Sequence, residues 1–163
     1  MKRIIIELKW AIVFTVMTVL WMLLEKSVGL HDKYIDKHAI YTNLIAIPAI
    51  ALYIFALLDK RRNFYGGTMT YGQGLKAGFI LTAIITILSP LSQYITSTFI
   101  TPHYFNNVIK YSVGHNYMTL KEAQDYFNLK SYIIQGFIGA PIMGVVTTLI
   151  VAAFTKKTLK GVN

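Results

Sequence analysis

The stretch SYIIQGFIGAPIMGVVTTLIVAAFT, residues 131–155, contains no charged side chain and decides the fold class. Residues 10–24, 39–58 and 77–100 are likewise free of Asp, Glu, Lys and Arg. A helix needs about 20 mostly apolar residues to cross a bilayer, and lipid requires every backbone group to be paired within its own segment. The sequence therefore predicts an all-α membrane protein with four transmembrane helices, over about residues 8–28, 39–58, 74–100 and 131–155.

The composition supports a single membrane domain over residues 1–163. Mean hydropathy is +0.50 and only 14% of the residues are charged, against about 25% in an ordinary soluble domain. Lys2 and Arg3 before the first apolar run are also typical of a signal peptide, but Glu25-Lys26-Ser27-Val28 lacks a cleavage pattern. We expect an uncleaved first span.

The net charge of +9 is explained by topology. In a soluble protein such an excess would indicate nucleic-acid binding, but here the basic residues lie mostly at the ends of apolar runs, so no nucleic-acid partner is expected. The chain has no cysteine, which excludes disulfides, thiolate nucleophiles and Cys-based metal sites.

The distribution of Lys and Arg predicts the orientation. Ten of the sixteen fall on one side: Lys2, Arg3, Lys9, Lys60, Arg61, Arg62, Lys76, Lys156, Lys157 and Lys160. The other six are Lys26, Lys33, Lys37, Lys110, Lys121 and Lys130. Because the more basic loops stay in the cytoplasm, both termini and the central loop are expected there, with Lys60-Arg61-Arg62 as the strongest marker.

The loop of about residues 102–130 is expected to lie outside and to form two short amphipathic helices. Thr101 is placed to cap a first helix that begins at Pro102 and ends at Gly114. Thr119 and Glu122 have the spacing of a capping box for a second helix. This outer cap is interpreted as a lid or spacer, with a docking surface for a partner as the alternative.

Four features together resemble a known family. A basic cluster follows the second span, and the stretch Thr70 to Gly78, TYGQGLKAG, opens the third. An exit through Tyr94 and Phe99 leads to Thr101-Pro102, and a glycine-rich fourth span ends in Lys156-Lys157. The chain resembles the small bacterial membrane proteins known as domain of unknown function 4199. The resemblance implies four spans and a bacterial inner membrane, but no activity, cofactor or functional residue.

Helix-packing signals are clear in the last two spans. Thr70 and Gln73 form a second capping box, which predicts that the third helix begins at Tyr71. Small residues recur every four positions in the fourth span, at Gly136, Ala140 and Gly144. This spacing lets two helix backbones approach closely, and it fits either an intramolecular contact or a homodimer face.

Prolines and polar residues mark the outer halves of the spans. Three prolines, Pro48, Pro90 and Pro141, are predicted to kink three helices, as ordinary bends or as hinges of a cavity. The polar residues of this region are Asn43, Ser89, Gln93, Thr96, Ser97 and Gln135. They are expected to bond helices together, or alternatively to line a small polar pocket.

The sequence contains few residues that could form a catalytic, ion-conducting or metal-binding site. No ionisable residue lies in the middle of a span, and such groups normally mark proton relays and ion pathways. The loop residues His31, Asp32, Asp36 and His38 are of types that bind divalent metals, but their spacing matches no established motif, so they are interpreted as exposed loop charges. No metal site, cofactor or catalytic residue is predicted.

The predicted function is therefore not enzymatic. We expect a membrane protein that acts by helix-mediated association with itself or with another membrane protein. The alternative is a small oligomeric transporter or channel that uses the outer-half polar residues and the kinked helices. Beyond these, the lipid bilayer is the only partner the sequence predicts.

Overall fold

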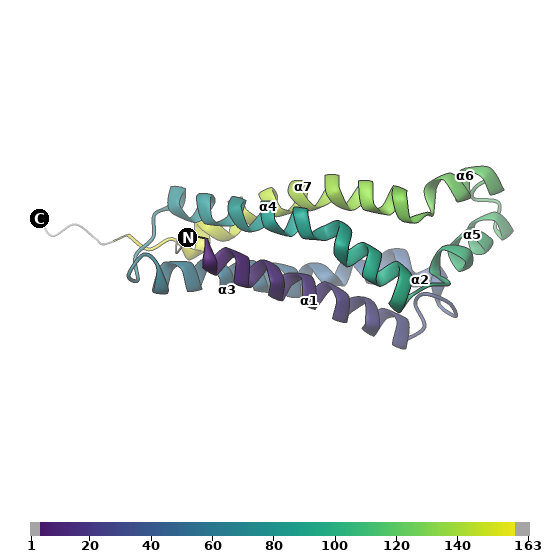
Figure 1. Cartoon of the computed structure of the whole chain (residues 1–163), viewed down its shortest axis with the longest axis horizontal. Coiled ribbons are helices and arrows are strands. Elements are labelled where there is room, and N and C mark those ends of the chain that lie inside the picture. The colour runs from purple at the N-terminus through teal and green to yellow at the C-terminus, as the bar shows by residue number, and fades with distance from the viewer. Residues whose placement is uncertain (1–3, 159–163) are drawn as a thin grey trace, which may run out of the picture.

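The computed structural model describes residues 4–158, in which helices are joined by short loops and the only extended pairing is one isolated bridge between Met69 and Lys157. In chain order the helices are α1 (Ile5–Ser27), α2 (Ile35–Tyr41), the 3-10 turn η1 (Thr42–Ile45), α3 (Ala46–Asn63), α4 (Tyr71–Ile95), the π-helical turn η2 (Thr96–Ile100), α5 (Tyr104–Gly114), α6 (Leu120–Tyr126) and α7 (Leu129–Thr155). Figure 1 shows an elongated bundle. We call the end with α2, α5 and α6 the cap end, and the opposite end, where α1 begins and α7 ends, the terminal end.

Four segments are long and apolar enough to cross a membrane, so the predicted all-α fold class with four spans is confirmed. They are Ile5–Ser27, Ile35–Asn63, Tyr71–Ile100 and Leu129–Thr155. The second segment joins α2, η1 and α3 without interruption, and the third joins α4 and η2. Most of their large apolar side chains remain exposed, as expected where lipid rather than protein covers them.

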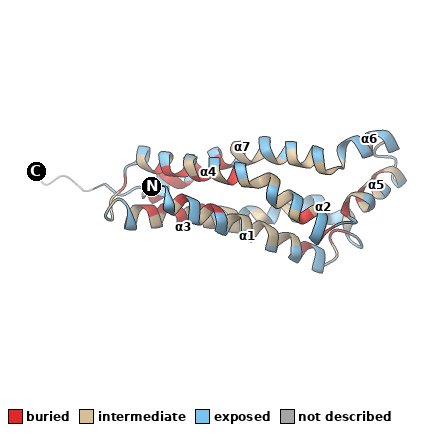
Figure 2. Cartoon of the chain, viewed as in Figure 1, coloured by how far each residue is buried: buried red, intermediate tan, exposed pale blue. Residues whose placement is uncertain are grey.

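The packed core lies in the half of the bundle nearer the terminal end (Figure 2). It is built mainly from Tyr53, Ala56, Leu57, Leu81, Ile85, Val151 and Ala152. Here α4 packs on α7 over its two small residues Gly74 and Gly78. A methyl group on Gly78 would lie 2.3 Å from Cγ2 of Thr148, so only glycine permits this approach.

Helix α4 begins as predicted. The Thr70 hydroxyl accepts a hydrogen bond from the Gln73 backbone, and the Gln73 side chain accepts one from the Thr70 backbone. Both bonds of the predicted capping box are therefore present, and they pair two donors that the first turn leaves free.

The three prolines of the spans lie at two kinds of position. Pro90 and Pro141 are inside α4 and α7, whereas Pro48 lies in the first turn of α3, just after the 3-10 turn. Pro90 has no N–H, so it cannot donate the backbone hydrogen bond that a helix makes to the carbonyl four residues earlier, here Thr86. The Ser89 hydroxyl donates to that carbonyl instead, at 2.9 Å. Figure 1 shows α4 turning away from α7 in its cap-end half.

One detail of the predicted loop is wrong. Helix α5 begins at Tyr104, not at Pro102, and no side chain caps it. The Thr101 hydroxyl and backbone N–H both donate to the carbonyl of Thr96. Thr101 therefore completes the preceding π-helical turn instead of capping α5. The spacing of residues in the sequence does not predict this turn.

Candidate functional site at the cap end

The candidate site is formed where α1 ends and the chain reverses into α2. After Ser27 the chain turns at Gly29, whose φ of +81° favours glycine. The Leu30 N–H donates to the carbonyl of Glu25, which holds the loop against the end of α1. This reversal brings His31 from the loop and His38 from α2 back onto Glu25.

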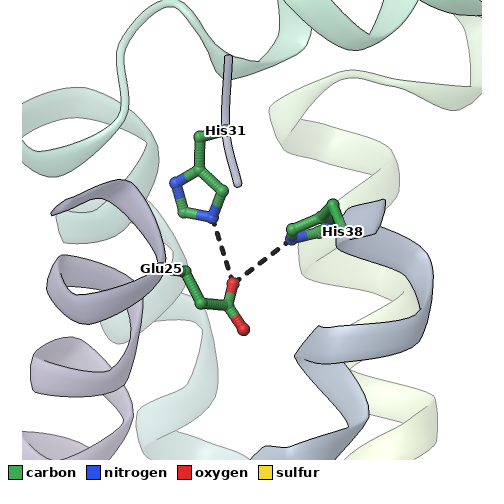
Figure 3. A group of neighbouring side chains, drawn as sticks. All are labelled: Glu25, His31 and His38. Carbon is green, nitrogen blue, oxygen red and sulfur yellow. Dashed lines mark hydrogen bonds and ion pairs between the residues drawn. The ribbon is translucent and has the colours of Figure 1, made fainter. Parts of the chain in front are cut away.

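Figure 3 shows the three side chains pointing toward one another. Nε2 of His31 lies 3.0 Å from Oε2 of Glu25, and Nε2 of His38 lies 3.3 Å from the same oxygen. The other carboxylate oxygen accepts a hydrogen bond from Nε1 of Trp21 at 2.5 Å. Glu25 is 1% exposed and His31 is 6% exposed, whereas His38 is half-buried, so the carboxylate itself is shielded from solvent.

A second layer of side chains holds the histidines in place. The Tyr104 hydroxyl lies 3.3 Å from Nδ1 of His38 and 3.2 Å from the Tyr132 hydroxyl. Nδ2 of Asn107 donates to the carbonyl of His31 at 3.0 Å. Burial, aided by neighbouring Tyr132, raises the pKa of the Tyr104 phenol well above its usual range, so the hydroxyl stays protonated.

One cavity adjoins this group, and a second meets the first. A chamber of about 170 Å³ is lined by both histidines, Tyr104, Thr96 and Thr101, among others. On the side of this chamber nearer the terminal end, a cleft of about 400 Å³ lies between α1, α4 and α7. Gln93 and Tyr132 line both spaces, so the polar chamber and the cleft meet at these two residues.

The electrostatics of the group follow from its burial. A buried carboxylate is costly unless it is paired, and the ion-pair partners found for Glu25 within residues 4–158 are the two histidines. Nδ1 of His31 is buried and has no hydrogen-bond partner among the described residues. Two imidazoles and one carboxylate are together able to hold a divalent metal ion.

Comparison with known proteins gives the family. The model of a family described as a protein of unknown function, DUF4199, matches residues 9–157. The chain belongs to this family. Neither the curated proteins nor the solved structures yielded a match. The family and the four apolar helices together make this DUF4199 chain a multi-pass membrane protein.

The polar residues named from the sequence divide into two groups. Ser89, Gln93 and Thr96 line the cleft or the chamber. Asn43 and Gln135 are exposed and bond within their own helices, Asn43 to the carbonyl of Ala39 and Gln135 to the Ser131 hydroxyl. These local bonds do not join separate helices, as was expected, and neither residue lines the pocket that was the alternative.

The predicted small-residue face is also divided. A Cβ atom on Gly144 would lie 2.4 Å from Cγ2 of Thr82 and 2.8 Å from the Tyr53 hydroxyl. A Cβ atom on Gly136 would have no atom of the described chain within 4 Å. Gly136 and Ala140 instead line the cleft, so only the Gly144 end of this face contacts another helix closely.

The residues named as topology markers all lie at the terminal end. Arg62, Lys156 and Lys157 are exposed. Arg61 donates to the carbonyl of Thr155 at 2.7 Å. Lys60 is 3% exposed and forms an ion pair with a residue of α1, so it is a packing residue as well as a charge.

Glu25 is the functional candidate that the sequence reasoning missed. The prediction of exposed loop charges at His31, Asp32, Asp36 and His38 is wrong for His31, which is buried. Both aspartates are exposed and lie outside the cluster. One signal was present, because Glu25 is acidic and directly follows the apolar run of α1. Its pairing with His38 depends on the turn at Gly29 and on the direction of α2.

Proposed function

We propose that this DUF4199 chain is non-enzymatic and acts by association of its transmembrane helices, in the first place with a second copy of itself. The observation that carries the proposal is the cleft between α1, α4 and α7. The surface that it exposes is mostly apolar, and Gly136, Gly139 and Ala140 are among the residues that line it. Small residues on an open helix face let another backbone approach closely.

No other part of the described chain packs over the glycines of α7 that line the cleft, which supports the proposal. Cβ atoms on Gly136 and Gly139 would both find no described atom within 4 Å. In contrast, three glycines of the terminal half are already covered, Gly74 by Ala152, Gly78 by Thr148 and Gly144 by Thr82. The bundle thus uses small residues to pack its own helices at one end and leaves similar residues uncovered at the other.

A photo-crosslinking residue tests the proposal. Benzoylphenylalanine in place of Ile133, which lines the cleft, is expected to give an adduct of about twice the monomer mass in intact membranes. The matched control carries the same residue in place of Met143 of α7, which is 63% exposed and is not among the cleft-lining residues. An adduct of another mass would make a different membrane protein the partner. No adduct above the Met143 control would overturn the proposal.

A small oligomeric transporter or channel is the second candidate, and one observation favours it. The cleft and the polar chamber share Gln93 and Tyr132, so polar groups lie at the junction. The tight packing at Leu57, Leu81 and Ala152 lies across the continuation of such a path through the terminal half. We therefore prefer association, and the two candidates are separated by an experiment on Gln93 described in the Discussion.

We further propose that the protein resides in a bacterial inner membrane with both termini in the cytoplasm. The excess of Lys and Arg at the terminal end supports this orientation. The two short helices of the cap end, α5 and α6, would then lie on the outer side as a lid or spacer over the bundle.

A further inference from the structure

We propose that Glu25, His31 and His38 bind one divalent transition-metal ion of the Zn²⁺ class, through Oε2 of the carboxylate and Nε2 of each imidazole. This inference does not depend on the proposed function. The three donor atoms lie within 4.8 Å of one another and come from three successive segments, α1, the following loop and α2. Each residue offers the ligand type that Zn²⁺ takes in proteins.

Two of the three distances between ligand atoms fit such an ion closely. Ligand atoms about 2.0–2.1 Å from a tetrahedral Zn²⁺ lie roughly 3.3 Å apart. The two nitrogen-to-oxygen distances are 3.0 and 3.3 Å, so these pairs need to separate by only a few tenths of an ångström, and the two imidazole nitrogens lie within 4.8 Å of each other. In Figure 3 both imidazole nitrogens point at one carboxylate oxygen.

The surroundings orient the ligands as metal sites generally require. The indole of Trp21 donates to Oε1 of Glu25, which leaves Oε2 for the ion. Tyr104 contacts the far nitrogen of His38, Nδ1, and fixes its ring. Asn107 anchors the backbone of His31.

Charge and access support the same conclusion. Glu25 is buried with two imidazoles, and when these are neutral the group has a net negative charge that a cation would balance. Both histidines also line the chamber of about 170 Å³. Three protein ligands beside such a space leave a fourth position for water or another small ligand.

Binding is tested on the full chain, purified in mild detergent without a polyhistidine tag and stripped with a chelator. Isothermal titration with Zn²⁺ is expected to show one saturable site per chain, and Co²⁺ is expected to give the strong visible absorption of a four-coordinate centre. If the wild-type chain shows no saturable site, the proposal fails regardless of any variant.

Three substitutions locate the site. His38→Gln and His31→Gln are each expected to weaken Zn²⁺ binding by at least about a hundredfold, since even residues that only support a ligand account for 10–100-fold. His115→Gln is the matched control, because His115 is exposed and lies in the same cap; it should bind as the wild type does. Unchanged binding in both ligand variants would assign the ion to another place and overturn the proposal.

A stability measurement covers the case in which a ligand variant folds poorly. Zn²⁺ is expected to raise the thermal midpoint of the wild-type chain and of His115→Gln, which keeps all three ligands and their supporting residues. Equal stabilisation of His38→Gln, or no stabilisation of the wild type, would contradict the assignment.

Discussion

The carboxylate of Glu7 on α1 and the ammonium group of Lys60 on α3 form a buried ion pair, with Nζ 2.9 Å from Oε1 and 3.0 Å from Oε2. The two residues are each 3% exposed. Nζ of Lys60 also lies 3.9 Å from the ring centroid of Phe64. The pair ties the first span to the second at the terminal end of the bundle.

Breaking this pair on one side should be strongly destabilising. Lys60→Met leaves the Glu7 carboxylate buried without its partner, and a loss of about 3–5 kcal/mol in the free energy of unfolding is expected. Unfolding by SDS in mixed micelles measures the change.

Two controls accompany the Lys60 variant. Arg62→Met removes a charge of the same sign from an exposed neighbour and should cost less than about 0.5 kcal/mol. The double variant Glu7→Met, Lys60→Met should recover most of the stability, because no unpaired charge remains buried. A double variant as unstable as Lys60→Met would show that the pair contributes by packing alone.

This pair also shows where sequence reasoning reached its limit. The apolar runs predicted the four spans, because lipid imposes a length and a composition on each helix. The Thr70–Gln73 capping box was predicted because its partners are three residues apart. Lys60, in contrast, was interpreted only as a topology marker, since its partner Glu7 lies on another helix.

The cap-end cluster was missed for a similar reason. Its members span only residues 25–38, yet His38 reaches Glu25 because the chain reverses at Gly29 before α2 begins. A sequence pattern does not specify that direction. Exposed Asp32 and Asp36 are nearer in sequence to the histidines and were therefore grouped with them.

The two ends of the small-residue face should respond differently to a methyl group. Gly144→Ala places a Cβ atom 2.4 Å from Cγ2 of Thr82 and is expected to cost about 1–3 kcal/mol through overpacking. Gly136→Ala enters the open cleft, where a Cβ atom meets no described atom within 4 Å, and should leave stability unchanged or raise it. Thermal midpoints in one detergent compare them. Equal midpoints for the two variants would mean that the helices move apart at Gly144 without penalty.

The orientation can be tested with paired topology reporters. A reporter fused to the C-terminus is expected in the cytoplasm, and one inserted at Gly114, the exposed last residue of α5, is expected outside. The reason is the basic terminal end, where Arg62, Lys156 and Lys157 are exposed. A cytoplasmic signal from the Gly114 insertion would contradict the orientation.

Gln93 separates the two candidate functions. Its side-chain nitrogen donates to the Ser97 hydroxyl at 2.9 Å, and the residue lines both the cleft and the chamber. Gln93→Leu keeps a similar volume but removes the amide donor and acceptor, so it makes the junction less polar while the helices stay packed. If the protein acts by association, stability should change by about 1 kcal/mol or less, and the crosslinked dimer obtained through position 133 should form at the wild-type level.

If the junction lies on a transport path, dimer formation and abundance should also be normal, but solute flux into liposomes seen with the wild-type chain should be lost. We expect no flux above empty liposomes for either form. A wild-type flux that the leucine variant abolishes would make transport the better assignment.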